Sequence, residues 1–163
     1  MTATVSPARV DIFTQLRAFI LGVITCEVVQ GLGNGTVMPL GGFIAITPLF
    51  QNRLATNVNT YADPTPTTGT KDSLQAVRYT VQIDAFGATS SDWATIISTA
   101  FRDEYACVAL GPNVQPLFCD DPKMIPLVDG EGQWNERWSI TAYMQYNPVV
   151  TTPMQFFDDP VVG

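Results

Sequence analysis

The chain has 163 residues, of which 46% are apolar, so it is long enough to form one domain with a hydrophobic core. Its 15 acidic residues outnumber its 8 basic ones, and the net charge of -7 argues against tight binding to DNA or to an anionic membrane. Histidine is absent, which excludes Ser-His and Cys-His catalytic pairs and removes the commonest zinc ligand.

The charged fraction is 14%, against about 25% in an average soluble domain. This predicts that partners cover part of the surface. Cys26, Cys107 and Cys119 show no short paired spacing, which indicates free thiols in a reducing compartment. The N-terminus lacks a signal-peptide pattern, and the apolar run at 18–24 is far shorter than the roughly 20 residues of a membrane span. We therefore expect a soluble protein made in the cytoplasm, with no membrane partner.

Residues 1–6 are predicted to form a loose arm. Ser6 and Pro7 then suit a helix start, with Pro7 at the first helical position. Apolar residues follow at helical spacing as far as Val23 and predict a helix of roughly four turns. Its apolar stripe either packs on a sheet or binds a partner.

A short β-prone stretch, 26–30, leads into a glycine-rich turn. Asn34 and Gly35 are the favoured pair for a tight hairpin turn. The stretch does not fit a phosphate-binding loop, because it lacks Gly-Lys-Ser/Thr and the G-x-G-x-x-G spacing. Residues 43–60 read as one long strand, with Pro48 at a bulge or an edge.

The segment 63–72, DPTPTTGTKD, has no large apolar side chain and is predicted to be a loop projecting between two strands. Beyond it, apolar residues alternate from Val77 to Ala85, as in a strand with one buried face. Gly87 ends the strand. Polar residues at 89–92 then suit a helix start, and apolar spacing from Trp93 to Tyr105 predicts a second helix.

Short strands are expected at 114–119 and 125–128, with a hairpin connection at 129–132. A second clear alternating strand follows at 134–146. The apolar tail VVTTPMQFFDDPVVG is either packed on its own domain or donated to another subunit. We therefore predict one α+β domain over residues 1–150, a mostly antiparallel sheet with two main helices on one face, and an extended C-terminal tail over 151–163.

Acidic pairs are the only candidates for chemistry. Asp120-Asp121-Pro122 and Asp158-Asp159-Pro160 share a triplet, and such carboxylates can bind Ca²⁺ or Mg²⁺. No EF-hand pattern surrounds them, and solvated turn residues explain them better than a metal site does. We predict no enzyme activity, cofactor or metal, while a metal-dependent hydrolase using Asp120 or Asp121 stays an alternative.

The order of the segments resembles the phage neck or tail terminator proteins, related to the lambda-type terminator. The matching pieces are VVQGLGNGTVMPLGG, FIAITPLFQNRLATN, VRYTVQIDAFG, SSDWATIISTAF and PKMIPLVDGEGQWNERWSITAYMQY. The resemblance covers about residues 8–147. It implies a structural virion protein that forms a ring, expected to be a hexamer, which caps the tail tube and joins it to the head connector.

By that resemblance, the expected partners are further copies of the chain, the tail tube protein and the connector, with genomic DNA passing through the ring unbound. The net acidity suits such a channel. The polar loop and the tail are the candidate contacts with neighbours. The residues proposed for them are Asp63, Pro64, Thr65, Lys71, Asp72, Met154, Phe156 and Phe157. Another head–tail joining, tail-completion or tail-tube protein of the virion is the alternative within the same class.

Overall fold

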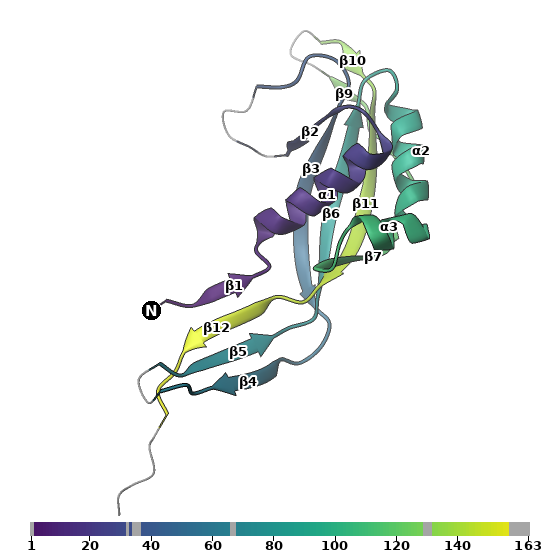
Figure 1. Cartoon of the computed structure of the whole chain (residues 1–163). Coiled ribbons are helices and arrows are strands. Elements are labelled where there is room, and N and C mark those ends of the chain that lie inside the picture. Colours follow the sequence, from purple (N-terminus) through teal and green to yellow (C-terminus); the bar gives the residue numbers. More distant parts are fainter. Residues whose placement is uncertain (1, 32, 34–36, 66–67, 129–131, 157–163) are drawn as a thin grey trace, which may run out of the picture.

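The computed structural model describes residues 2–31, 33, 37–65, 68–128 and 132–156. The fold is α+β, as predicted, with helices on one side of a main sheet and a smaller sheet beyond its end (Figure 1). The helices are α1 (Arg9–Val23), α2 (Ser90–Phe101) and α3 (Glu104–Ala109). The main sheet contains β2 (Glu27–Gln30), β3 (Phe43–Arg53), β6 (Val77–Phe86), β11 (Arg137–Tyr146), β7 (Val114–Cys119) and β8 (Lys123–Met124).

Strand β6 lies at the centre of the main sheet, between β3 and β11, and pairs with both in antiparallel fashion. The side chains predicted to point inward, from Val77 to Ala85, are all buried. The alternation therefore predicted the strand and its core-facing side correctly, but Thr80 and Asp84 on the other face are buried as well. A register shift in β3 between Pro48 and Phe50 confirms that Pro48 sits at a bulge, one of the positions where a strand tolerates proline.

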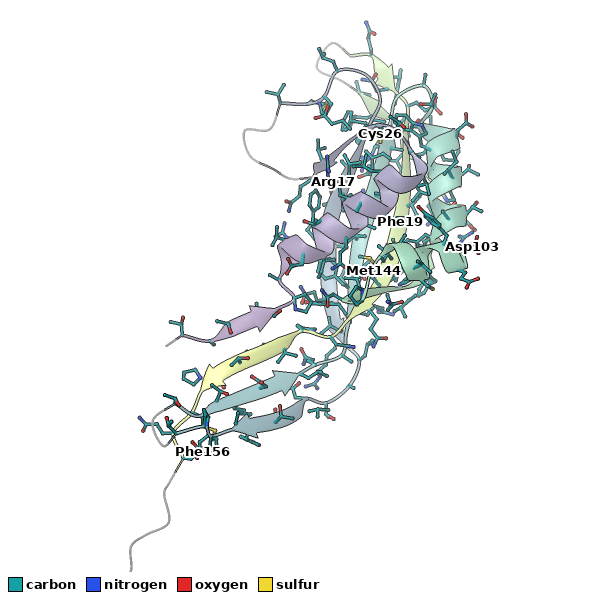
Figure 2. The ribbon with its side chains drawn as sticks, viewed as in Figure 1. Arg17, Phe19, Cys26, Asp103, Met144 and Phe156 are labelled. Carbon is teal, nitrogen blue, oxygen red and sulfur yellow. The ribbon has the colours of Figure 1, made fainter. Side chains whose placement is uncertain are left out.

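The core lies between the main sheet and the helices. From α1 it takes Ile12, Leu16, Phe19 and Ile20, and the ring of Phe19 meets that of Phe101 of α2 edge-on at 5.9 Å. Figure 2 shows Phe19 of α1 and Met144 of β11 within this layer. The amphipathic stripe of α1 thus faces the sheet. No helix in the described residues is long and apolar enough to span a membrane.

The predicted start of the first helix is wrong. Helix α1 begins at Arg9, after Ala8, and the Asp11 carboxylate accepts a hydrogen bond from the Ala8 amide at 2.7 Å. Ser6 and Pro7 lie outside the helix because the chain before Pro7 is a strand and not the loose arm that was predicted. Residues Thr4–Ser6 form strand β1 and pair with residues 149–151 near the other end of the chain.

The tight turn predicted at Asn34-Gly35 lies outside the described residues. Strands β2 and β3 on either side of this turn pair in parallel, and a tight hairpin joins antiparallel strands only. Parallel neighbours require the chain to cross back along the sheet. Alternating and β-prone residues carry no information about that choice.

Other strand limits differ in detail. The long strand expected at 43–60 is divided into β3 and β4 (Val58–Ala62). The strand expected at 134–146 is divided into β10 (Trp134–Asn135) and β11. Strand β10 pairs with β9 (Leu127–Val128) in antiparallel fashion, as the predicted hairpin requires, while residues 129–131 between them lie outside the described part.

A second sheet, which we name the small sheet, contains β1 (Thr4–Ser6), β12 (Val149–Pro153), β5 (Thr70–Leu74) and β4, in that spatial order. Three of its strands continue central strands of the main sheet, since β4 follows β3, β5 precedes β6 and β12 follows β11. The small sheet therefore projects from the end of the main sheet, away from the helices (Figure 1).

Candidate subunit interface

The small sheet has no core of its own. No residue of its four strands is buried, and none of the described helices packs on either face (Figure 1). Its charged side chains are Lys71 and Asp72, both on β5. A sheet that is neutral, thin and open on two sides gains little from burying apolar area within its own chain. The small sheet is therefore a candidate for contact with another protein.

Residues paired across neighbouring strands share a face, so the strand register assigns each side chain. One face has mostly threonine and aliphatic side chains: Thr4, Ser6, Val58, Thr60, Ala62, Thr70, Asp72, Leu74, Val149, Thr151 and Pro153. The other face has Val5, Asn59, Tyr61, Lys71, Ser73, Val150 and Thr152. Large apolar side chains are exposed on both, including Val58 at 60% and Tyr61 at 57%.

Side-chain hydrogen bonds connect the strands of the small sheet. Thr151 Oγ1 donates to Asp72 Oδ1 at 2.6 Å, joining β12 to β5. Ser73 Oγ donates to Asn59 Oδ1 at 2.8 Å, joining β5 to β4. These bonds stabilise the ladder where apolar packing is sparse. They also show that Asp72, a predicted contact residue, is engaged within its own chain.

The predicted projecting loop is shorter than expected. Lys71 and Asp72 belong to strand β5, and the connection between β4 and β5 is left to residues 63–69. Asp63, Pro64 and Thr65 are exposed in it, and the Thr68 amide donates to the Thr65 carbonyl at 3.1 Å. These three residues lie at the far end of the small sheet, where contact with a neighbour is possible.

The tail residues return to this same end. The Met154 amide donates to the Gly69 carbonyl at 2.8 Å, and the Phe156 ring meets that of Tyr61 edge-on at 6.3 Å (Figure 2). A side chain at Gly69 would collide with the Phe156 ring, because an added Cβ would lie 2.3 Å from it. The tail was predicted either to pack on its own domain or to be donated to another subunit. Its described part packs on its own chain. Phe157 lies outside the described residues.

The predicted contact residues that the structure describes all lie in or beside the small sheet, but the structure adds features that the sequence reading missed. Strands β1 and β4 form the two outer edges of the small sheet. The available signal was the absence of charge and proline in VNTYA, residues 58–62, since most exposed edges carry such residues. That signal identifies an edge only once the strand order is known.

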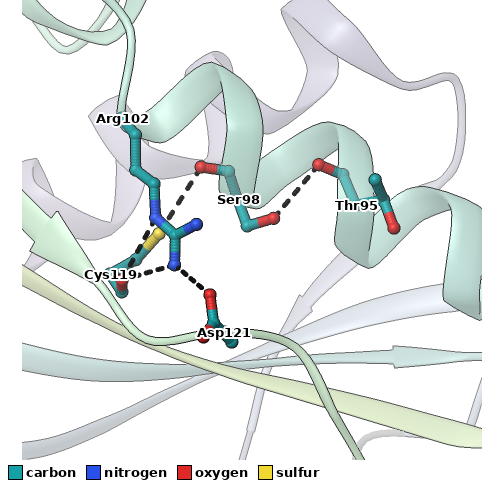
Figure 3. Close-up of polar contacts among 5 residues, drawn as sticks. All are labelled: Thr95, Ser98, Arg102, Cys119 and Asp121. Atoms are coloured by element: carbon teal, nitrogen blue, oxygen red, sulfur yellow. Dashed lines mark hydrogen bonds and ion pairs between the residues drawn. The ribbon is translucent and has the colours of Figure 1, made fainter.

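The acidic pair Asp120-Asp121 has a structural partner. Arg102 at the end of α2 donates to Asp121 Oδ1 at 2.8 Å and to the Cys119 carbonyl at 2.9 Å (Figure 3). Burial raises the pKa of the Cys119 thiol, whose Sγ donates to the Ser98 carbonyl at 3.5 Å. This cluster fastens β7 to α2. Within the described part of the chain, no group of three or more His, Cys, Asp or Glu residues is arranged to hold a metal ion.

The face of the main sheet opposite the helices carries a buried ion pair. Arg137 Nη2 lies 3.0 Å from Asp84 Oδ2, and the Asp84 side chain is only 5% exposed. Gln82 Nε2 donates to both Asp84 oxygens, at 3.0 and 2.8 Å, and the Arg137 guanidinium lies 5.7 Å from the centroid of the Phe86 ring. The carboxylate is thus hydrogen-bonded on several sides, as an anchor between β6 and β11.

Comparison with known proteins gives one clear match. The sequence profile described as phage neck terminator protein matches residues 10–163, which is nearly the whole chain. No curated protein matches the chain. The profile match begins within α1, so strand β1 lies outside it.

Proposed function

The chain belongs to the phage neck terminator family, a family of structural proteins of the tail and neck, and we propose that copies of it form a closed ring at the end of the tail tube. The ring is expected to be a hexamer that joins the tube to the head connector and lets the genome pass. The observation that carries this proposal is the family match over nearly the whole chain.

The small sheet supports the ring. A closed ring needs a head-to-tail contact, in which two different surfaces of each copy meet. The small sheet offers exposed apolar residues on two faces and two different edges, and its strands contain only one acid and one base. Asp63, Pro64, Thr65, Lys71, Asp72, Met154 and Phe156 lie in or beside it and remain the proposed contact residues, together with Phe157.

The charge balance supports passage of DNA without retention. A net charge of -7 leaves few basic residues to neutralise phosphates, and retention of DNA depends on such contacts. We therefore propose that the channel wall is not basic. A ring whose lumen is lined by the chain's arginines and lysines would contradict this part of the proposal.

The test is the mass of the purified protein in solution, measured by native mass spectrometry over a concentration series, with binding to isolated tail tubes as a second readout. One subunit has a mass of 17.7 kDa. A closed ring of six copies gives a single species of about 106 kDa, with no open ladder of larger forms. A chain that stays monomeric at every concentration and also fails to bind tail tubes would contradict the proposal.

A further inference from the structure

The two outer strands of the small sheet, β4 and β1, each have one edge that no other described strand pairs with. Every second residue of an edge strand points its amide and carbonyl away from the sheet, where they can pair with another chain. Natural edges are commonly blocked by lysine, proline, a bulge or a very short strand. Strand β1 has only three residues and Pro7 follows it, so its pairing is limited to residues 4–6. Strands β4 and β1 contain neither charge nor proline, and β4 pairs with β5 over residues 58–62 without a shift in register. All their side chains are exposed.

The directions of the two edge strands are complementary. Each neighbouring pair in the order β1-β12-β5-β4 is antiparallel, so β1 and β4 run in opposite directions. Rotation about a ring axis preserves the direction of every strand relative to that axis. When small sheets stand side by side around the axis, β4 of one copy therefore meets β1 of the next in antiparallel orientation, which continues the alternation of the sheet.

We propose that β4 of one copy pairs with β1 of the next copy, so that the small sheets join into one continuous sheet around the ring. This inference rests on the proposed ring and names the surfaces that form it. The occupant of each edge is a second copy, because the edges are two ends of one sheet whose strands run in opposite directions and are both exposed and uncharged. A pairing of β4 with β4 across a two-fold axis would instead close a dimer.

The register assigns faces across the new contact as well. Rotation keeps each face of the sheet on the same side, so Val5 of β1 shares a face with Asn59 and Tyr61 of β4 and not with Thr60. A disulfide needs Cβ atoms within about 3.5–4.5 Å, which neighbouring strands allow only for side chains on one face.

The experiment uses the full chain with the exposed Cys107 and the partly exposed Cys26 changed to Ser, and with the buried Cys119 kept. Two pairs test the contact, Val5→Cys with Asn59→Cys and Val5→Cys with Tyr61→Cys. The matched control is Val5→Cys with Thr60→Cys, one residue away on the opposite face. The three single-cysteine variants of β4 accompany them. The positions in β1 and β4 that receive cysteines are all exposed, so these substitutions spare the core.

After mild oxidation, at least one face-matched pair is expected to give a denaturant-resistant ladder that rises to the full ring, while the Thr60 control stays at one subunit. A native ring in which neither face-matched pair forms a ladder would overturn the edge pairing without contradicting the proposed ring. Dimers from a single β4 cysteine would overturn it in favour of two-fold pairing. A chain that neither assembles nor cross-links would overturn the ring and the pairing together.

Discussion

Asp84 shows how one buried charge can hold two strands of this fold together. Its carboxylate is 5% exposed, while the Arg137 side chain that pairs with it is 22% exposed. Removing one partner of a buried ion pair leaves the other charge uncompensated, which costs about 3–5 kcal/mol. We therefore expect Arg137→Met to lower the free energy of unfolding by about 3–5 kcal/mol, measured by urea denaturation.

The matched control is Asp121→Asn, which removes one charge of an ion pair whose side chains are 44% (Arg102) and 85% (Asp121) exposed and leaves the hydrogen bond from Arg102 to the Cys119 carbonyl in place. Water already solvates those charges, so the loss should be much smaller. The double variant Asp84→Asn with Arg137→Met should recover part of the stability, because the stranded charge is gone. Equal losses for Arg137→Met and Asp121→Asn would show that burial of Asp84 does not contribute to stability.

Among the secondary-structure elements, the sequence predicts correctly those whose apolar residues repeat with the period of a strand or a helix. The alternation in β6 and the stripe of α1 give the correct type of element and the correct buried face. Strand β1 escapes the same reading, because three residues carry no period and their partner β12 begins 143 positions later. The parallel pairing of β2 and β3 depends on a crossover that no local pattern records.

The candidate interface was predictable only in part. The polar composition of residues 63–72 predicts a connection, and the structure confirms that this segment joins two strands. Composition alone does not show where β5 begins. Lys71 and Asp72 are strand residues since their neighbours Thr152 and Thr151 lie beside them, supplied by the far end of the chain. The exposed edges follow only from strand order, which is a property of the whole fold.

The stripe of α1 allows a test at the same scale. Leu16 is fully buried between the helix and the sheet, whereas Leu21 on the same helix is 37% exposed. We expect Leu16→Ala to lower the free energy of unfolding by about 2–5 kcal/mol, through lost burial and a cavity. Leu21→Ala should stay within about 1 kcal/mol of the parent chain. Similar losses in urea denaturation would contradict the assignment of the buried face.

At the scale of the whole molecule, the main sheet and the small sheet differ in stability. The main sheet and its helices contain the buried cluster, while the small sheet contains none of it. Regions with few buried apolar contacts open at low free energy, even within a well-folded protein. The small sheet should therefore be the least stable part of the described fold in an isolated subunit, and the part that gains most when a partner covers it.

Hydrogen exchange tests this division on the unmodified chain. In dilute monomer, amides of β4 and β1 should exchange much faster than those of β6 and β11, which are central in the main sheet. In the assembled ring, the outward amides of β4 and β1 should become protected, because pairing between copies removes their access to water and stabilises the ordered state by mass action. Strand β5, already paired on both sides, serves as the internal control, since its protection should rise through stabilisation of the sheet alone. Unchanged exchange in β4 and β1 on assembly would place the contact between copies elsewhere on the molecule. Protection of both strands in the dilute monomer would mean that the small sheet stays ordered without a neighbour.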